Sequence, residues 1–65
     1  MNNYQRLTKL RENSDLNHRE MSELLGISRA FYWQIENKKR TLTYDMAKRI
    51  AKIFKKKPDD IFYEE

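Results

Sequence analysis

The 65-residue chain contains no cysteine, only one glycine and only one proline. Without cysteine, neither disulfide bonds nor a thiolate metal site can stabilise it, which is typical of proteins in a reducing cytosol. The chain also lacks an apolar run long enough for a signal-peptide core or a membrane span. These absences predict a soluble, cytoplasmic protein with no membrane partner.

Glycine, proline and β-branched residues are few, whereas leucine, lysine, arginine and glutamate are abundant. This composition favours an all-α fold, and a chain of this length makes one small domain over residues 1–65. So small a core makes a water-excluding active site hard to build. The sequence also has no nucleophile–base pair, no cluster of metal ligands and no phosphate-binding glycine loop. We therefore expect a binding module and not an enzyme, with no cofactor, metal or small-molecule ligand.

The positive charge is concentrated in one part of the chain, which carries a net charge of +4 overall. Residues 29–57 hold ten basic and two acidic side chains, a net charge of +8, and the other residues hold four basic and eight acidic, a net charge of −4. Such asymmetry is typical of a surface that binds a polyanion. The alternative is a solvated helix face, which explains most lysine runs.

The spacing of apolar residues divides the chain into about five short helices. The first is expected from about residue 3 to about residue 13. The fourth begins after Thr43, a suitable capping residue, and a last short turn begins at Pro58. The predicted apolar stripe of the fourth helix consists of Met46, Ala47, Ile50, Ala51 and Phe54.

Residues 17 to about 37 form the most informative unit. Asn17 stands three residues before Glu20, the spacing of a capping box at the start of a helix. Gly26 suits the left-handed end of that helix, and Ser28 can cap a third helix from residue 29 to about 37. Two capped helices joined by a tight turn make a helix-turn-helix, which presents its second helix to the major groove of DNA.

Three consecutive aromatic residues stand in the third helix. At 100° per residue, Phe31 and Tyr32 fall in one apolar sector and are expected to face the core. Trp33 falls on another face, beside Arg29 and Ala30. Three alternatives remain for Trp33: it packs on the DNA backbone or thymine methyl groups, it covers the edge of the core, or it lies in a protein interface.

The sequence from Leu7 to Phe62 resembles the Cro/C1-type (Xre family) helix-turn-helix domain of phage repressors and related bacterial regulators. The resemblance rests on Arg11 in the first helix, on the "E-x-x-x-x-x-G-[VI]-S" pattern that ends at Ser28, on "I-E-N" and on the closing "P-D-D-I-F". It implies a compact lambda-repressor-like bundle of about five helices that binds operator DNA, usually as a dimer, without enzymatic activity.

The resemblance implies base contacts from the first two residues of the recognition helix and from a residue about one turn later. At these positions the chain has Arg29, Ala30 and Gln34, with Trp33 on the same face. Arginine can make a bidentate contact to guanine, glutamine can do the same to adenine, and alanine can touch a thymine methyl group. The alternative for Arg29 is a solvated position, although positive charge in the first turn is mildly unfavourable to the helix dipole.

The resemblance further implies phosphate contacts at the start of the second helix and around the third. The residues concerned are Asn17, His18, Ser28, Asn37, Lys39 and Arg40. His18 stands where the family commonly has glutamine, so this contact can depend on pH. Where the family has glycine after "I-E-N", this chain has Lys38, although Asn37 tolerates the left-handed conformation better. The helix either ends one residue early or continues into the loop.

The resemblance also implies that Arg11 pairs with Glu36 and locks the recognition helix to the first helix. Ile61, Phe62 and Tyr63 are expected either in the core or in a homodimer contact. The leading prediction is a sequence-specific double-stranded DNA-binding regulator that represses transcription by occupying an operator through residues 29–37. The alternative is a protein-interaction module on the same fold, such as an antitoxin, an adaptor or an antirepressor partner.

Overall fold

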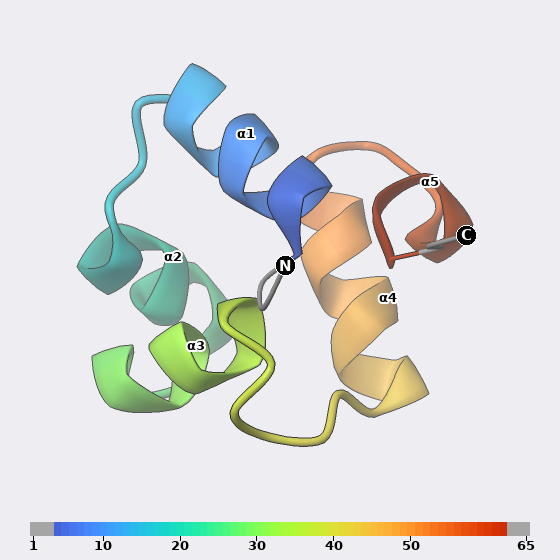
Figure 1. Cartoon of the computed structure of the whole chain (residues 1–65). Helices are drawn as coiled ribbons and strands as arrows, with labels where there is room; N and C mark the ends of the chain where they lie inside the picture. Colours follow the sequence, from blue (N-terminus) through green and yellow to red (C-terminus); the bar gives the residue numbers. More distant parts are fainter. Residues whose placement is uncertain (1–3, 63–65) are drawn as a thin grey trace.

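The computed structural model describes residues 4–62, which form five helices and no strand (Figure 1). The helices are α1 (Gln5–Asn13), α2 (His18–Leu25), α3 (Arg29–Glu36), α4 (Tyr44–Ile53) and α5 (Pro58–Phe62). The predicted all-α fold of about five short helices is confirmed. The first helix begins later than predicted, at Gln5, and the third ends at Glu36, one residue earlier than the approximate prediction.

Side-chain caps begin three of the helices where the sequence predicts them. Asn17 Oδ1 accepts a 2.7 Å hydrogen bond from the Glu20 amide, and Glu20 Oε1 accepts one of 3.0 Å from the Asn17 amide. This reciprocal pair is a complete capping box. Ser28 Oγ and Thr43 Oγ1 accept hydrogen bonds from backbone amides in the first turns of α3 and α4. These caps satisfy amides that have no partner within their own helices.

The first four helices end in the same way, although only one of the four ends contains glycine. After each helix one residue has a positive φ, and its amide and the next amide donate back to the last turn in the Schellman pattern. The left-handed residues are Asp15, Gly26, Lys38 and Lys55. After α3, Asn37 has φ −96° and Lys38 has φ 58°. Lys38 therefore adopts the conformation that Asn37 was expected to tolerate better.

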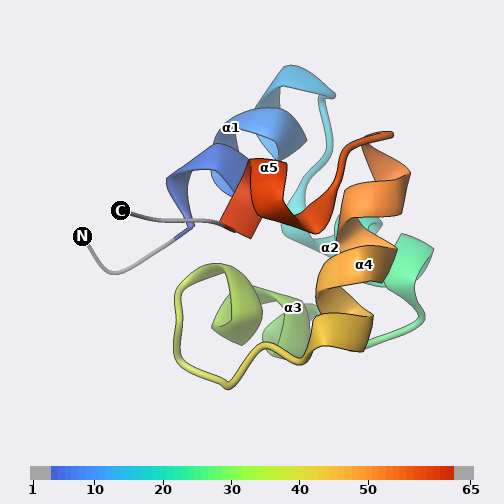
Figure 2. The same cartoon turned by 90° about the vertical axis from the view of Figure 1, so that its right-hand side faces the viewer.

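The five helices surround one apolar core (Figures 1 and 2). Figure 1 shows α2 and α3 together on one side, with α4 and α5 on the other and α1 above them. The buried members of this core are Leu7, Met21, Leu25, Tyr32, Ile35, Ile50, Ala51 and Ile61. In the predicted stripe of α4, Ala47, Ile50 and Ala51 are buried, whereas Met46 and Phe54 are half-buried.

The aromatic triplet of α3 divides as predicted. Tyr32 is fully buried, Phe31 is half-buried against the core, and Trp33 is 45% exposed. Within residues 4–62, no helix has both the length and the apolar character needed to cross a membrane. Because Trp33 is exposed, the protein presents a large aromatic side chain at the surface of α3, the helix that follows the turn at Gly26.

Candidate nucleic-acid interface

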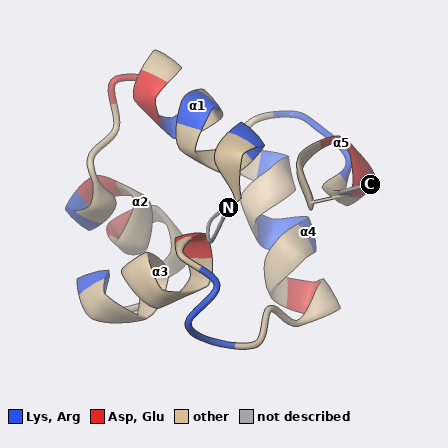
Figure 3. Ribbon diagram, viewed as in Figure 1, with Lys and Arg blue, Asp and Glu red and all other residues tan. Residues whose placement is uncertain are grey.

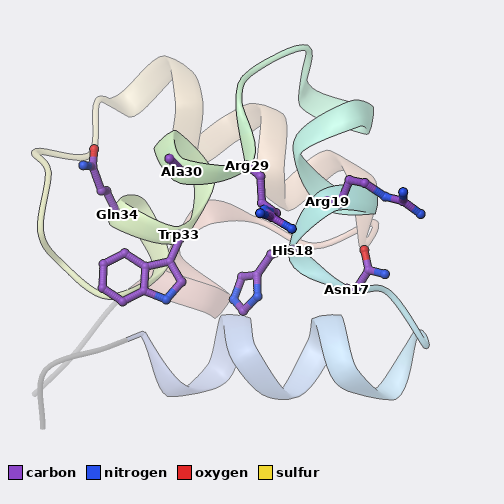
Figure 4. A pocket seen from close by; sticks show the side chains of 7 residues that line it. All are labelled: Asn17, His18, Arg19, Arg29, Ala30, Trp33 and Gln34. Atoms are coloured by element: carbon purple, nitrogen blue, oxygen red, sulfur yellow. The ribbon is translucent and has the colours of Figure 1, made fainter.

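The starts of α2 and α3 border a surface hollow of about 580 Å³. The side chains around it are Asn17, His18, Arg19, Arg29, Ala30, Trp33 and Gln34 (Figure 4). The four residues predicted to contact bases thus lie together, with two of those predicted to contact phosphate. Arg19 is an additional cation that the sequence prediction missed. Its place directly after Asn17 and His18 was the only available signal.

The side chains around the hollow come from two helices whose relative position is set by the turn at Gly26. The amides of Gly26 and Ile27 donate to the carbonyls of Glu23 and Ser22, with N–O distances of 3.2 and 3.0 Å. Gly26 has φ +70°, which favours glycine because a side chain is strained there. Figure 4 shows the Trp33 indole and the His18 ring pointing to the same side of the two helices.

A buried ion pair joins α3 to α1. Arg11 Nε donates to Glu36 Oε1 over 2.9 Å, and Arg11 Nη2 donates to Glu36 Oε2 over 3.1 Å. Their side chains are 9% and 4% exposed, and Arg11 Nη1 also donates to the Leu16 carbonyl. This is the two-point geometry in which arginine holds a carboxylate most firmly. The pair therefore fixes the end of α3 against the first helix.

Two further side chains complete the surroundings of the Glu36 carboxylate. The Tyr32 hydroxyl donates to Oε1 over 2.7 Å, and His18 Nε2 lies 3.1 Å from Oε2. Burial alone would raise the pKa of Glu36, but the hydrogen bonds from Arg11, Tyr32 and His18, together with the charge of Arg11, hold that pKa below its ordinary value. Burial and the neighbouring carboxylate raise the pKa of the Tyr32 hydroxyl. The carboxylate is thus held in its charged form.

His18 occupies a different position from that of a fully exposed phosphate ligand. Its side chain is 32% exposed, and Nε2 points to Glu36 inside the protein. Its ring centre lies 5.8 Å from that of Tyr32. The rest of the ring borders the hollow in Figure 4. His18 therefore connects the buried carboxylate with the surface that Arg29 and Gln34 share.

The loop after α3 carries the basic run Lys38, Lys39 and Arg40, which appears as a continuous blue segment in Figure 3. All three side chains are exposed. The Lys38 ammonium lies 4.8 Å from the centre of the Tyr4 ring. The three side chains border a second hollow, between this loop and the ring of Phe62. The basic loop thus lies outside the first hollow, and Arg40 is connected to that hollow by a hydrogen bond to Gln34.

The remaining predicted phosphate ligands lie at the two ends of α3. Ser28 is exposed, and its hydroxyl caps the helix by accepting from the Phe31 amide. Asn37 is half-buried, and its Nδ2 donates to the Trp33 carbonyl over 3.0 Å. Each side chain therefore has a structural role in addition to the phosphate contact predicted for it.

The predicted dimer contact includes Ile61 and Phe62, the last two residues of α5. Ile61 is buried in the core, and Phe62 is half-buried with its ring edge-on to Tyr4, 5.1 Å between centres. Tyr63 lies outside the described residues.

Within the described part of the chain, no group of three or more His, Cys, Asp or Glu side chains could hold a metal ion.

A capped helix, a left-handed turn at glycine and a second capped helix with polar side chains on its open face define a helix-turn-helix protein. Residues 4–64 match the model of a helix-turn-helix domain family, and the chain belongs to that family, in agreement with a Cro/C1-type (Xre) DNA-binding domain. Comparison with curated proteins and with solved structures finds no match. The family indicates a DNA-binding regulator.

Proposed function

We propose that the protein is a sequence-specific transcriptional repressor that inserts α3 into the major groove of an operator. The observation that carries this proposal is the hollow that gathers Arg29, Ala30 and Gln34 at one surface. Arg29 and Ala30 are exposed, and Gln34 is half-buried. Polar side chains that reach base edges from one helix face are the direct means by which this class of domain reads sequence.

We call the surface that carries Arg29, Ala30 and Gln34 the reading face. Cations around this reading face would hold the DNA backbone. Arg19 borders the hollow itself, and Lys39 and Arg40 are exposed in the loop after α3. At the start of α2 the capping box uses the amides of Asn17 and Glu20, and a phosphate can bind at the amides of the two residues between them. Such contacts set the position of the protein on the duplex without reading its sequence.

The repressor would bind as a homodimer on two half-sites, and occupation of the operator would exclude RNA polymerase. Ile61 is buried within its own protomer, so a contact at the end of α5 would involve the half-buried Phe62 and residues beyond it. A footprint on the DNA upstream of the coding sequence tests the dimer, because two protected half-sites would lie about one helical turn apart. A single short protected site would contradict it.

Selection from a random DNA pool, followed by affinity measurements on single base-pair variants, tests sequence reading. Arg29→Ala and Gln34→Ala should each relax the preference at one or two base pairs, at about 1–3 kcal/mol each. Lys48→Ala is the matched control, because Lys48 is exposed on α4 and its nearest carboxylate is that of Asp45. It should leave the sequence preference unchanged. If Arg29→Ala weakens binding to all sequences alike, Arg29 contacts phosphate.

The 45% exposure of Trp33 supports a second candidate, a protein-interaction module. Exposed aromatic side chains are enriched in protein interfaces. Salt distinguishes the two functions, because DNA affinity that depends on several phosphate contacts falls steeply as salt rises. An apolar protein contact through Trp33 would change little over the same range. Loss of DNA binding in Trp33→Ala at every salt concentration would assign this side chain to the DNA interface.

A further inference from the structure

Arg40 lies in the loop after α3 and reaches back to the reading face. Its Nε donates a 3.0 Å hydrogen bond to Gln34 Oε1, and its guanidinium carbon lies 4.5 Å from the centre of the Phe31 ring. A hydrogen bond and a cation–π contact thus hold one planar group. Because the group is planar and rigid, the two contacts restrict its orientation.

The hydrogen bond also distinguishes the two ends of the Gln34 amide. An unrestrained glutamine can turn its amide over and exchange donor and acceptor. Here Oε1 accepts from Arg40, and the opposite orientation would place the amide hydrogens against the Nε–H of Arg40. The amide nitrogen is therefore left to donate to a base, and the second lone pair of Oε1 can still accept from an adenine amino group.

We propose that Arg40 is a positioning residue that sets the base preference of Gln34, an inference that rests on the proposed operator binding. Only Nε of the Arg40 guanidinium has a hydrogen-bond partner among residues 4–62. The terminal nitrogens can therefore bind a backbone phosphate while Nε holds Gln34. Arg40 would then bind a DNA phosphate and Gln34 a base, and the hydrogen bond between the two side chains would link these contacts.

The test uses the DNA duplex that the wild-type protein selects from a random pool, with each base pair substituted in turn. Arg40→Lys keeps the positive charge but removes the planar guanidinium. We expect it to retain most of the affinity and to lose the discrimination at the base pair read by Gln34, a loss of about fivefold or more. Lys39→Ala is the control, because it removes a neighbouring exposed cation and should weaken binding to all variants alike.

The double variant Gln34→Ala with Arg40→Lys should discriminate no worse at that base pair than Gln34→Ala alone, since the two side chains act as one unit. Additive losses in the double variant, or wild-type discrimination in Arg40→Lys, would overturn the inference. If the wild-type protein selects no common sequence, the proposed function itself fails, and the two failures are therefore distinguishable.

The contact between His18 and Glu36 carries a second, independent inference. An ionised carboxylate only accepts hydrogen bonds, so His18 Nε2 bears the hydrogen in its 3.1 Å contact with Glu36. A neutral imidazole has one N–H, and Nδ1 then has a lone pair that cannot donate to a phosphate. Only the doubly protonated ring can donate to Glu36 and to a phosphate at the same time.

We infer that His18 takes up a proton when it binds a DNA phosphate, so that DNA affinity falls as pH rises; this inference too rests on the proposed function. The groups facing the ring are the carboxylate of Glu36 and the hydroxyl of Tyr32, with Arg11 on the far side of the carboxylate. Arg19 and Arg29 line the same hollow. A DNA phosphate would add a second negative charge beside the ring and favour the added proton.

Affinity for the selected duplex, measured from pH 5.5 to 7 at constant salt, tests this inference. His18 is the only histidine in the chain, and the range lies below that of an α-amino group. We expect the wild-type affinity to fall by up to about tenfold per pH unit in the steepest part of the range. His18→Gln replaces the ring with an amide that donates without titrating, so its affinity should not change with pH.

Calorimetry in buffers of different ionisation enthalpy provides a direct measurement of proton uptake by the wild-type protein during binding. Uptake of a fraction of one proton near neutral pH is expected. Binding without proton uptake, or the same pH dependence in His18→Gln, would overturn the inference. Sequence-specific binding that is independent of pH would still support the proposed function.

Discussion

The Tyr32 hydroxyl donates a 2.7 Å hydrogen bond to Oε1 of Glu36, one helical turn further along α3. Tyr32 is fully buried, so water does not compete for this bond. The same carboxylate oxygen accepts from Arg11 Nε, and Oε2 accepts from Arg11 and contacts His18. An aromatic residue of the core thus helps to hold the charge that ties α3 to α1.

Tyr32→Phe should lower the free energy of unfolding by about 2 kcal/mol, because it removes a buried hydrogen bond to a charged group while keeping the ring. Urea denaturation gives this value. Tyr44→Phe is the matched control, since Tyr44 is 69% exposed and its ring lies beside the Lys48 ammonium at the surface of α4. Equal stability of Tyr32→Phe and wild type would contradict the role of the hydroxyl.

Glu36→Ala should cost about 3–5 kcal/mol of stability, because it leaves the Arg11 guanidinium buried without its counter-charge. For so small a domain this loss can abolish the thermal unfolding transition. Glu23→Ala, which removes an exposed carboxylate from α2, should melt close to the wild-type temperature.

Removal of both partners, in Arg11→Met with Glu36→Leu, should cost clearly less than the sum of the two single changes. The comparison separates the ion pair from general damage to packing. Additive losses would show that the two side chains contribute independently. Equal thermal stability of Glu36→Ala and wild type would rule out a stabilising pair.

The stability should fall in acid, partly because of Glu36. Its pKa in the folded protein lies below the ordinary value of 4.5, so protons bind the unfolded chain first as the pH decreases. The contribution of Glu36 is therefore complete above about pH 4.5 and is lost as the pH falls through its lower, folded-state pKa. Urea midpoints from pH 7 to pH 2 should show the difference between wild type and Glu36→Gln narrowing in acid. A constant difference would contradict this expectation.

Lys55→Gly should stabilise the protein by about 1 kcal/mol, because Lys55 has φ 56° after α4 and glycine adopts that conformation without steric cost. Lys56→Gly is the control at the next residue, which is exposed and has no positive φ. It should destabilise slightly, by adding freedom to the unfolded chain. Thermal melts of the two variants at equal ionic strength compare them, and the opposite order would show that Lys55 is not strained.

The caps and the apolar spacing of this chain were enough to predict where most helices begin and which face of each is buried. Asn17, Ser28 and Thr43 stand directly before α2, α3 and α4, and the helical repeat separates Tyr32 from Trp33. These features depend on neighbours within a few residues. Local geometry therefore determines them, and they can be read directly from the order of the residues.

The helix ends and the side-chain partners were harder to predict. Glycine marks only one of the four left-handed residues, and Lys38 and Lys55 are of a residue type that rarely adopts that conformation. The bond from Arg40 to Gln34 depends on how the loop returns towards α3. The contact between His18 and Glu36 depends on how α2 packs on α3. Such partners are set by tertiary packing, which single-residue preferences do not encode.

The backbone at the end of α3 is held as well as its side chain, because the Tyr4 amide donates to the Glu36 carbonyl over 2.9 Å. Residue 36 is thus attached to the start of α1 and, through Arg11, to a position two turns further along it. If α1 separated from the bundle in a partial unfolding event, α2 and α3 could keep their own hydrogen bonds while α3 lost its fixed orientation. The rate of hydrogen exchange at the Tyr4 amide would then report the fraction of molecules in which α3 has lost that orientation.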